Sequence, residues 1–292
     1  MKLGFIGLGV MGRPMALNLM KGGHEMAVYG RRAASVESLV AAGARAFPTP
    51  AEVAAHADIV FTVVTNSSDV EEVVLGTSGV IHGAERGSVV VDMETISPVV
   101  ARNIARSLAE KGMDMLDAPV SGGPMGAEQA TLSIMVGGKP AVFERVRPLF
   151  QCLGKTIVHI GDHGAGQITK ACNQLALLVT AQGAAEALSL AKRSGVDVAR
   201  VRDVMMGGVA ASRVLELFGK RMIDRNFENG IDTRLYYKDL DIVLALAHEL
   251  GIALPAAALT MQSINALIGR GEGRQDLSSI IRIVEDMSGA KP

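Results

Sequence analysis

The first half of the chain alternates short apolar runs with segments whose apolar residues recur at helical spacing. The apolar runs are rich in β-branched residues and predict strands at 2–7, 25–30, 58–64, 87–93, 114–119, 131–138 and 155–161. Helical patterns separate them, for example at 34–43, 97–112 and 141–154, and several end in glycine, as helices commonly do. Strands that alternate with helices predict a parallel sheet with helices on both faces.

After about residue 161 the predicted strands cease and helical patterns continue. A long helix is expected from Gly164 to about Ser194, followed by helices at 198–206, 210–223, 235–250, 255–270 and 276–288. We therefore predict the α/β fold class. A Rossmann-type, doubly wound and mostly parallel sheet covers residues 1–161, and an all-α domain covers 162–292, of which 162–194 is the linking helix.

Three glycines follow the first predicted strand in the stretch GLGVMG. In a βαβ unit this spacing indicates dinucleotide binding. Gly7 allows the tight turn, Gly9 lets the backbone approach a pyrophosphate, and Gly12 permits close packing of helix on strand. The amides at the start of the helix then face the anion. In a chain with 33 glycines this spacing can also arise by chance. Its position at the first βαβ turn favours a dinucleotide site.

The end of the second strand distinguishes the two nicotinamide dinucleotides. An acidic side chain there binds the ribose 2′-hydroxyl of NAD and repels the 2′-phosphate of NADP. The stretch VYGRRAAS instead offers Arg31 and Arg32, whose forked guanidinium groups suit a phosphate. We therefore favour NADP(H) over NAD(H) as the cofactor. The alternative is an exposed arginine pair that only solvates a loop.

Lys170 and Asn173 lie three positions apart in an otherwise apolar helix of small residues, so they share one face. Carbonyl reduction needs a proton donor as negative charge develops on the oxygen, and a lysine whose pKa is lowered by burial can supply it. We predict that Lys170 is the catalytic group and that Asn173 positions the substrate oxygen or the lysine. On composition alone, a solvated lysine at a helix start is an equal alternative.

Two further stretches carry candidate ligands. DAPVSGG ends a strand with Ser121 and two glycines, whose hydroxyl and exposed amides suit a carboxylate; the alternative is a flexible turn without a ligand. Lys238 begins a predicted helix in YYKDLDIVLALA. It either closes over the cofactor or pairs with a neighbouring aspartate, Asp239 or Asp241, on the surface.

Composition narrows the class of partner. The formal net charge is −1 and no long run of lysine or arginine occurs, so neither nucleic acid nor an anionic membrane surface is a predicted partner. No uninterrupted apolar run reaches the roughly 18 residues of a membrane span. The two cysteines, Cys152 and Cys172, fit no disulfide framework or metal-ligand pattern, so no metal is predicted and a reducing cytoplasm is expected.

These stretches together resemble the β-hydroxyacid dehydrogenase family, the group of 3-hydroxyisobutyrate dehydrogenase and tartronate semialdehyde reductase. The resemblance covers nearly the whole chain, in the order GFIGLGVMGRPMALNL, VVDMETISP, DAPVSGG with TLSIMVGG, GAGQITKACNQ and YYKDLDIVLALA. It implies an NAD(P)-dependent oxidoreductase with a small carboxylate-bearing substrate. It also implies a homodimer or homotetramer in which the helical domain, besides binding substrate, mediates association.

The resemblance also implies roles for particular residues. The family's catalytic lysine corresponds to Lys170, with Asn173 beside it, and its substrate-binding Ser-Gly-Gly corresponds to Ser121, Gly122 and Gly123. Its cofactor contacts fall in the glycine turn, after the second, third and fourth strands and on one lysine of the helical domain: Val10, Met11, Arg31, Val64, Thr65, Asn66, Thr95 and Lys238. The glycines of the turn, Gly7, Gly9 and Gly12, and the second arginine, Arg32, complete the predicted cofactor site.

The chain departs from the family pattern at three of these places. Glu94 stands where many members have serine, beside Thr95, and its carboxylate either disturbs that corner or points outward. Gly30 replaces an asparagine before Arg31, which removes a possible phosphate donor that Arg32 can replace. Thr65 stands where proline is common, so rigidity is lost there.

The expected reaction is reduction of a short carboxylate-bearing semialdehyde, or oxidation of a β-hydroxyacid in the reverse direction. The preferred substrate is tartronate semialdehyde (2-hydroxy-3-oxopropionate), which would be reduced to D-glycerate. Alternatives within the family are a 3-hydroxyisobutyrate dehydrogenase and a succinic semialdehyde or glyoxylate reductase. An alternative of another class is a non-catalytic NADP-binding sensor. The intact set of Lys170, Asn173 and Ser121 favours the enzyme.

Overall fold

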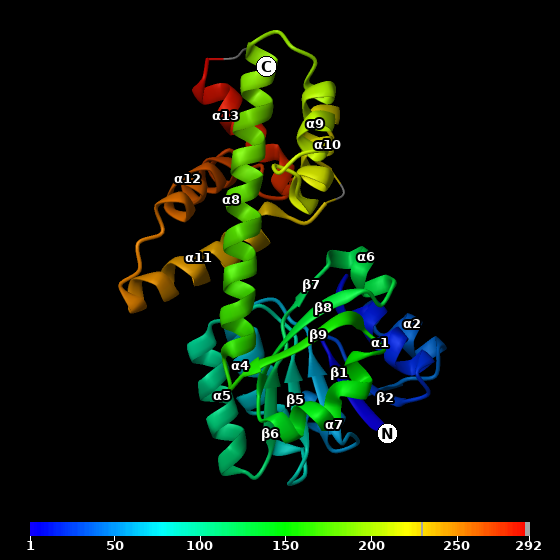
Figure 1. Ribbon diagram of the computed structural model, residues 1–292. Helices are drawn as coiled ribbons and strands as arrows, with labels where there is room; N and C mark the ends of the chain where they lie inside the picture. The colour runs from blue at the N-terminus through cyan, green and yellow to red at the C-terminus, as the bar shows by residue number, and fades with distance from the viewer. Residues whose placement is uncertain (229, 290–292) are drawn as a thin grey trace. The chain divides into compact units, whose positions relative to one another are not determined.

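The structure is a computed structural model that describes residues 1–228 and 230–289 (Figure 1). It divides into two compact units, Met1–Lys170 and Ala171–Pro292. The division therefore falls within a continuous helix, α8 (Ala165–Arg193), whose first turns belong to the first unit.

The first unit contains one sheet in the order β3-β2-β1-β4-β5-β6-β8-β7, with β9 paired to β8. From β3 to β6 all neighbours are parallel, whereas β8 runs antiparallel to β6 and β7. The strands are β1 (Lys2–Ile6), β2 (Glu25–Tyr29), β3 (Arg45–Ala46), β4 (Ile59–Thr62), β5 (Val89–Asp92), β6 (Asp114–Asp117), β7 (Val120–Ser121), β8 (Leu132–Gly138) and β9 (Gly154–Gly161).

Helices cover both faces of this sheet, because its parallel strands are apolar on both sides. Phe5 of β1 packs in one core, together with residues of α1, α2 and α7, and the next residue, Ile6, packs in the opposite core with α3, α4 and α5. The helices are α1 (Gly12–Lys21), α2 (Glu37–Ala41), α3 (Pro50–Ala54), α4 (Ser67–Leu75), α5 (Pro98–Glu110), α6 (Gly123–Glu128) and α7 (Pro140–Phe150), with short 3₁₀ turns at Ala33–Ser35 and Val80–His82.

The predicted fold class is confirmed: the sheet is doubly wound and mostly parallel, and helices follow it. Each predicted strand is present with slightly different ends. Two strands, β3 and β7, were not predicted, because each is two residues long and two residues show no periodicity.

The second unit is helical within its described residues. Its core is formed by one stripe of α8, with Leu178 and Leu188, together with Leu240, Ile264 and Ile280 from later helices. These helices are α9 (Val198–Met206), a π-helical turn (Leu215–Gly219), α10 (Lys220–Asp224), α11 (Thr233–Leu250), α12 (Pro255–Gly269), a 3₁₀ turn (Leu277–Ser279) and α13 (Ile280–Met287).

Among the described residues, α8 is long and apolar enough to cross a membrane, and it alone meets that test. Half of its apolar stretch is buried inside the protein. Its buried face supplies Leu178, Ala181, Ala185 and Leu188 to the core of the second unit. Length and hydropathy of this kind are typical of the central helix of a helical core, and this is how α8 is used.

Candidate active site

The strand order places a topological switch point between β1 and β4. The chain runs from β1 outward to β2 and β3 and then crosses back to β4 on the other side of β1. Ligands of open α/β sheets bind outside the carboxyl ends of the strands at such a point. The glycine turn leaves β1 at this edge, and the segments after β4, β5 and β6 leave their strands at the same edge.

The glycine turn has the geometry that a pyrophosphate site needs. Gly7 has a φ of +94°, and a Cβ there would collide with the carbonyl oxygen of Val63. A Cβ on Gly12 would collide with the carbonyl oxygen of Gly7, whereas a Cβ on Gly9 would point into open space. Gly7 and Gly12 therefore let the turn close on itself, and Gly9 leaves the approach to the backbone open.

The helix after this turn begins without a side-chain cap. Met11 occupies the N-cap position of α1, and its thioether offers the first-turn amides no oxygen. The amide of Arg13 donates to the Gly9 carbonyl at 3.1 Å. Val10 is 68% exposed, which is unusual for valine. The start of α1 thus has the uncapped, positively polarised end that binds phosphate groups, and the predicted contacts of Val10 and Met11 lie there.

Arg31 and Arg32 are exposed in the loop that follows β2. The Arg31 guanidinium lies 3.7 Å from Asp69 Oδ1 across a surface where its own side chain is 75% exposed, so this ion pair is weak. The local packing explains why glycine occupies position 30. A Cβ there would collide with the Ser35 hydroxyl, which donates to the Arg32 carbonyl at 2.6 Å. Ser35 thus stands where the family's asparagine side chain would project.

The segment after β4 begins helix α4. Asn66 is its N-cap: Oδ1 accepts from the Asp69 amide at 2.9 Å and from the Ser68 hydroxyl at 2.8 Å. Val64 is half-buried and lies against the glycine turn, since its side chain would be 3.0 Å from a Cβ on Gly7. Thr65 is exposed between them. The structure gives Asn66 a capping role, which leaves its side-chain nitrogen for a ligand.

Ser121 ends β7 and is paired with Ser133 of β8. Gly122 and Gly123 follow with φ values of +134° and +63°, which side chains rarely adopt. The turn leads directly into α6. The two glycines therefore allow, directly after Ser121, a backbone course that residues with side chains rarely adopt.

Lys170 is only 7% exposed, in the second turn of α8. The start of this helix is anchored by Asp117 at the end of β6, whose carboxylate accepts from the amides of Gly164 at 2.8 Å and Gln167 at 3.0 Å. Gly166 allows the close approach, because a Cβ there would collide with the carbonyl oxygens of Asp117 and Met135. The interpretation of Lys170 as a solvated surface residue is inconsistent with this burial.

Gln167, one helical turn before Lys170, joins α8 to the segment after β5. Its Oε1 accepts from the Ile96 amide at 3.1 Å, and its Nε2 donates to the Glu94 carbonyl at 2.7 Å. These partners flank Thr95, which was predicted to contact the cofactor. Lys170 and Thr95 thus belong to elements that one side chain connects.

Three buried polar side chains lie in register at the ends of β4, β5 and β6, namely Thr62, Asp92 and Asp117. The Thr62 hydroxyl donates to Asp92 Oδ1 at 2.7 Å. Burial, assisted by the charge of nearby Glu94, raises the pKa of Asp92 to about 8. Burial also raises the pKa of Asp117, although the hydrogen bonds that its carboxylate accepts from backbone amides act to lower it. Asp92 therefore holds its proton at neutral pH.

The second unit contains the two remaining predicted residues in one polar chain. Asn173 Nδ2 donates to Gln174 Oε1 at 2.8 Å, and Gln174 Nε2 donates to Asp239 Oδ2 at 2.5 Å. Lys238 Nζ lies 3.5 Å from Asp239 Oδ1. Of the two aspartates expected as partners of Lys238, Asp239 is the one this ion pair uses, and its side chain is buried rather than on the surface.

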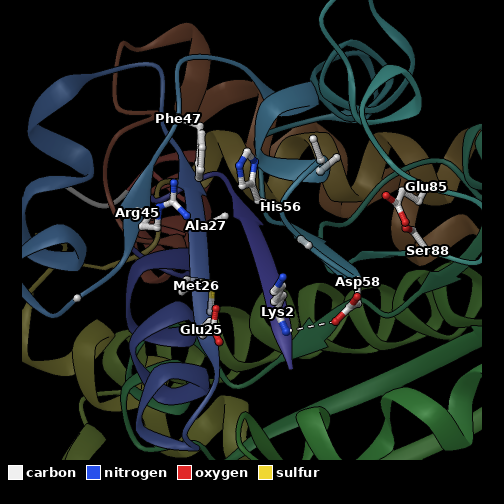
Figure 2. Close-up of a pocket in the computed structure, with 14 residues that line it drawn as sticks. Lys2, Glu25, Met26, Ala27, Arg45, Phe47, His56, Asp58, Glu85 and Ser88 are labelled. Atoms are coloured by element: carbon white, nitrogen blue, oxygen red, sulfur yellow. Dashed lines mark hydrogen bonds between the residues drawn. The ribbon is translucent and has the colours of Figure 1, made fainter.

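A pocket of about 370 Å³ lies at the opposite edge of the sheet (Figure 2). It is lined by Lys2 and Glu25, the first residues of β1 and β2. Phe47 lies between Arg45 and His56 in Figure 2. The centroid of the Phe47 ring is 4.4 Å from that of the His56 ring and 5.3 Å from the Arg45 guanidinium carbon. Lys2 and Glu25 lie at the amino ends of their strands, whereas Arg45 is paired with Ala27 in the middle of β2 and the Phe47 amide donates to the Val28 carbonyl.

The predicted residues of the first unit thus gather at one edge of the sheet, and Asn173 and Lys238 share one network in the second. Sequence reasoning missed Asp92, Asp117 and Gln167. The available signal was the polar residue that ends each buried strand, in VVDM and in DAPV.

Comparison with known proteins gives a family for both parts of the chain. Residues 2–161 match a family model described as the NAD binding domain of 6-phosphogluconate dehydrogenase. Residues 164–284 match one described as NAD-binding of NADP-dependent 3-hydroxyisobutyrate dehydrogenase. The chain is 43% identical over 291 residues to 2-hydroxy-3-oxopropionate reductase of Escherichia coli strain K12, covering 100% of this chain and 99% of that protein.

Two solved structures of similar proteins support the same family. The Mycobacterium tuberculosis 3-hydroxyisobutyrate dehydrogenase with L-serine matches with a TM-score of 0.89 at 30% identity, covering 97% of this chain and 98% of that one. A complex of Psf3 with NADP⁺ and 2-OPP matches with a TM-score of 0.87 at 25% identity, covering 97% of this chain and 99% of that one.

Proposed function

The chain belongs to the β-hydroxyacid dehydrogenase family, the group of 3-hydroxyisobutyrate dehydrogenase and 2-hydroxy-3-oxopropionate reductase, and from this premise we propose that it reduces a short carboxylate-bearing semialdehyde with NADPH. It is therefore an oxidoreductase. The observation that carries the proposal is the burial of Lys170 at the start of α8, in a helix tied to the segment that contains Thr95.

Lys170 is the proposed proton donor. As the aldehyde is reduced, negative charge develops on its oxygen, and a buried ammonium group both stabilises that charge and donates a proton to it. In the reverse direction the neutral amine removes the hydroxyl proton of a β-hydroxyacid. Asn173, one turn further along α8, orients the same oxygen. Bound NADPH would supply the hydride for the carbonyl carbon.

The substrate carboxylate is assigned to Ser121, Gly122 and Gly123. A hydroxyl and backbone amides at a turn bind a small anion without carrying a net charge of their own. Holding the carboxylate at one end and the carbonyl oxygen at the other orients a three- or four-carbon substrate for reaction.

NADPH is preferred in this proposal because Arg31 and Arg32 follow β2 where NAD enzymes commonly have an acidic residue. The open approach to Gly9 and the uncapped start of α1 fit the pyrophosphate. The arginine pair fits a 2′-phosphate, because both side chains are exposed and each carries a forked set of donors. Support comes from the NADP-dependent description of the second family model and from the NADP⁺ complex of Psf3. The remaining assigned contacts are Val10, Met11, Val64, Thr65, Asn66, Thr95 and Lys238.

Tartronate semialdehyde is the proposed substrate, since the E. coli relative is named 2-hydroxy-3-oxopropionate reductase. The second candidate is oxidation of 3-hydroxyisobutyrate, supported by the M. tuberculosis structure of that name. We assign residues 1–161 to dinucleotide binding and 162–292 to substrate binding and association as a homodimer or homotetramer. Exposed apolar side chains in the second unit, Val204 and Leu259 among them, support association. A cytoplasmic location fits two free cysteines, Cys152 and Cys172.

Initial rates of NADPH and NADH oxidation against the semialdehydes of tartronate, methylmalonate and succinate, and against glyoxylate, test the proposal. We expect the highest kcat/KM with tartronate semialdehyde and NADPH. We also expect replacement of Arg31 and Arg32 by alanine to raise KM for NADPH and leave KM for NADH unchanged. Binding of NADPH without turnover of any of these compounds, or of 3-hydroxyisobutyrate in the reverse direction, would instead support a non-catalytic sensor.

A further inference from the structure

Gln167 is almost completely buried, and both ends of its side-chain amide are used. Its oxygen accepts from the Ile96 amide and its nitrogen donates to the Glu94 carbonyl, at 3.1 and 2.7 Å. The two partners are the neighbours of Thr95 in the chain. The Gln167 amide therefore pairs with this segment as one strand residue pairs with another, and fixes the main chain on both sides of Thr95.

The main chain of Gln167 is held as well, because its own amide donates to Asp117 Oδ2 at 3.0 Å. Asp117 ends β6 and Glu94 follows β5, so one residue connects the start of α8 to the ends of two neighbouring strands. Lys170 follows one helical turn later on the same helix, where side chains three positions apart are neighbours.

We propose that Gln167 is a positioning residue that holds Lys170 and Thr95 in one fixed geometry. This inference rests on the proposed function, in which Lys170 donates the proton and Thr95 contacts the cofactor. The two groups stand on different elements, α8 and the segment after β5, so their relative placement depends on what joins those elements. A displacement of about 1 Å in such a constellation costs on the order of 10² in rate.

The chemistry of the side chain is specific. Methionine has a similar length and shape but can make neither hydrogen bond. Asparagine keeps the amide but is one methylene shorter, so it can satisfy at most one of the two partners. Glutamate would set a carboxylate oxygen against the Glu94 carbonyl in place of a donor.

The same helix supplies a matched control. Gln182 is also buried, but its Nε2 donates to Glu186 Oε1, at 2.7 Å, on α8 itself. Gln182→Met therefore removes a buried glutamine from the helix without cutting a connection to another element. Gln167→Met and Gln182→Met are to be compared in the full chain, with thermal unfolding as the check that each folds.

Steady-state kinetics give the first readout. We expect kcat to fall on the order of 10²-fold in Gln167→Met. KM for NADPH should change by no more than a factor of about three, because of the assigned cofactor contacts only Thr95 is displaced and the glycine turn is untouched. Gln182→Met should keep both parameters. Gln167→Asn should give a smaller fall in kcat, and it serves as the test variant if Gln167→Met does not fold.

Acylation of Lys170 by an amine-reactive acetylating reagent, followed by peptide mass spectrometry over a range of pH, gives a second readout that needs no substrate. In Gln167→Met we expect Lys170 to be acetylated several-fold faster than in the wild-type protein, with a changed midpoint of the pH profile. In Gln182→Met the Lys170 profile should match the wild type.

The two proposals fail in different ways. If the wild-type protein reduces none of the carbonyl compounds, the proposed function fails, and the acetylation profiles alone decide the role of Gln167. If a folded Gln167 variant keeps both kcat and the Lys170 profile, the positioning role is wrong. It is also wrong if Gln182→Met shows the same losses, because helix stability would then explain both.

Discussion

At the scale of single residues, Lys170 carries the chemistry. We expect Lys170→Met to lower kcat by a factor on the order of 10²–10⁴, as loss of a general acid typically does. NADPH binding should stay unchanged, because the residues assigned to the pyrophosphate lie in the turn after β1. Lys155→Met, at an exposed position of β9, is the matched control and should keep full activity. Fluorescence titration with NADPH and single-turnover rates separate the two effects. A Lys170 variant with wild-type kcat would exclude this lysine as the proton donor.

Asp92 makes a second residue-scale prediction, on the pH dependence of stability. The pKa of this carboxyl is about 8 in the folded protein against 3.8 normally, so the folded state holds a proton that the unfolded chain releases. Stability from this group is complete at acid pH and is lost as pH rises toward 8, at about 1.4 kcal/mol per pH unit. The side-chain amide of the Asp92→Asn variant cannot ionise and can still accept a hydrogen bond from Thr62. The free energy of unfolding of the variant should therefore rise relative to that of the wild type between pH 5 and pH 8.

Urea unfolding at several pH values measures this difference. Glu94→Gln removes a charge that helps to raise the pKa of Asp92. It should therefore reduce the pH dependence of stability in the same direction as Asp92→Asn, but by a smaller amount. A difference between wild type and Asp92→Asn that does not change with pH would show that Asp92 is already ionised in the folded protein.

At the scale of elements, the placement of α8 depends on its first turn. The Asp117 carboxylate accepts from two amides there, and loss of such a cap typically costs about 0.5–2 kcal/mol. Asp197 caps α9 in the same way, accepting from the amides of Ala199 and Arg200 at 2.9 and 3.2 Å, on the surface. We expect Asp117→Ala and Asp197→Ala each to lower the free energy of unfolding. Only Asp117→Ala should also lower kcat, since only α8 carries Lys170.

Denaturant unfolding and steady-state kinetics on both variants check this. Equal loss of stability with kcat kept in both would show that the start of α8 is held by other contacts. Because Asp117 is buried whereas Asp197 is exposed, the loss of stability should be larger for Asp117→Ala.

The elements themselves were largely predictable, because most are long enough to show a period. Strands β1, β2, β4, β5 and β6 and the helices from α8 to α12 follow from the pattern of apolar residues. The predicted helix at 210–223 contains the π-helical turn Leu215–Gly219, which the helical period does not distinguish from α-helix. Strand β3, which pairs with β2, and strand β7, which pairs with β8, are too short to leave a pattern in the sequence.

The candidate site was predictable only where its residues form local motifs. Gly7, Gly9 and Gly12 signal themselves by spacing, and Lys170 by its apolar surroundings. Gln167 does not, because its partners lie 71 and 73 positions earlier in the chain. Asp117 is separated from the amides it caps by 47 and 50 positions. Pairings at this separation are set by the order of strands in the sheet, which a single sequence does not display.

At the scale of the whole molecule, the chain has two units with separate cores. The first is built on both faces of the sheet, and the second on the buried stripe of α8 with the helices that follow. The glycine turn and the arginine pair belong to the first unit, and the network of Asn173 and Lys238 belongs to the second. A cofactor that binds through the sheet edge should therefore stabilise the two cores unequally.

Hydrogen exchange with and without NADPH measures this inequality in the full chain. At a free concentration 100 times its Kd, a ligand that binds only the folded state adds about 2.7 kcal/mol to the opening that releases it. We expect amides of β1, β4 and β5 to exchange about 100-fold more slowly with NADPH, and amides of α12 and α13 to be protected less. NADH at the same concentration should protect the strands less than NADPH does, because it lacks the 2′-phosphate assigned to Arg31 and Arg32. Equal protection of strands and helices would show instead that the two cores open as one cooperative unit, with the cofactor stabilising both.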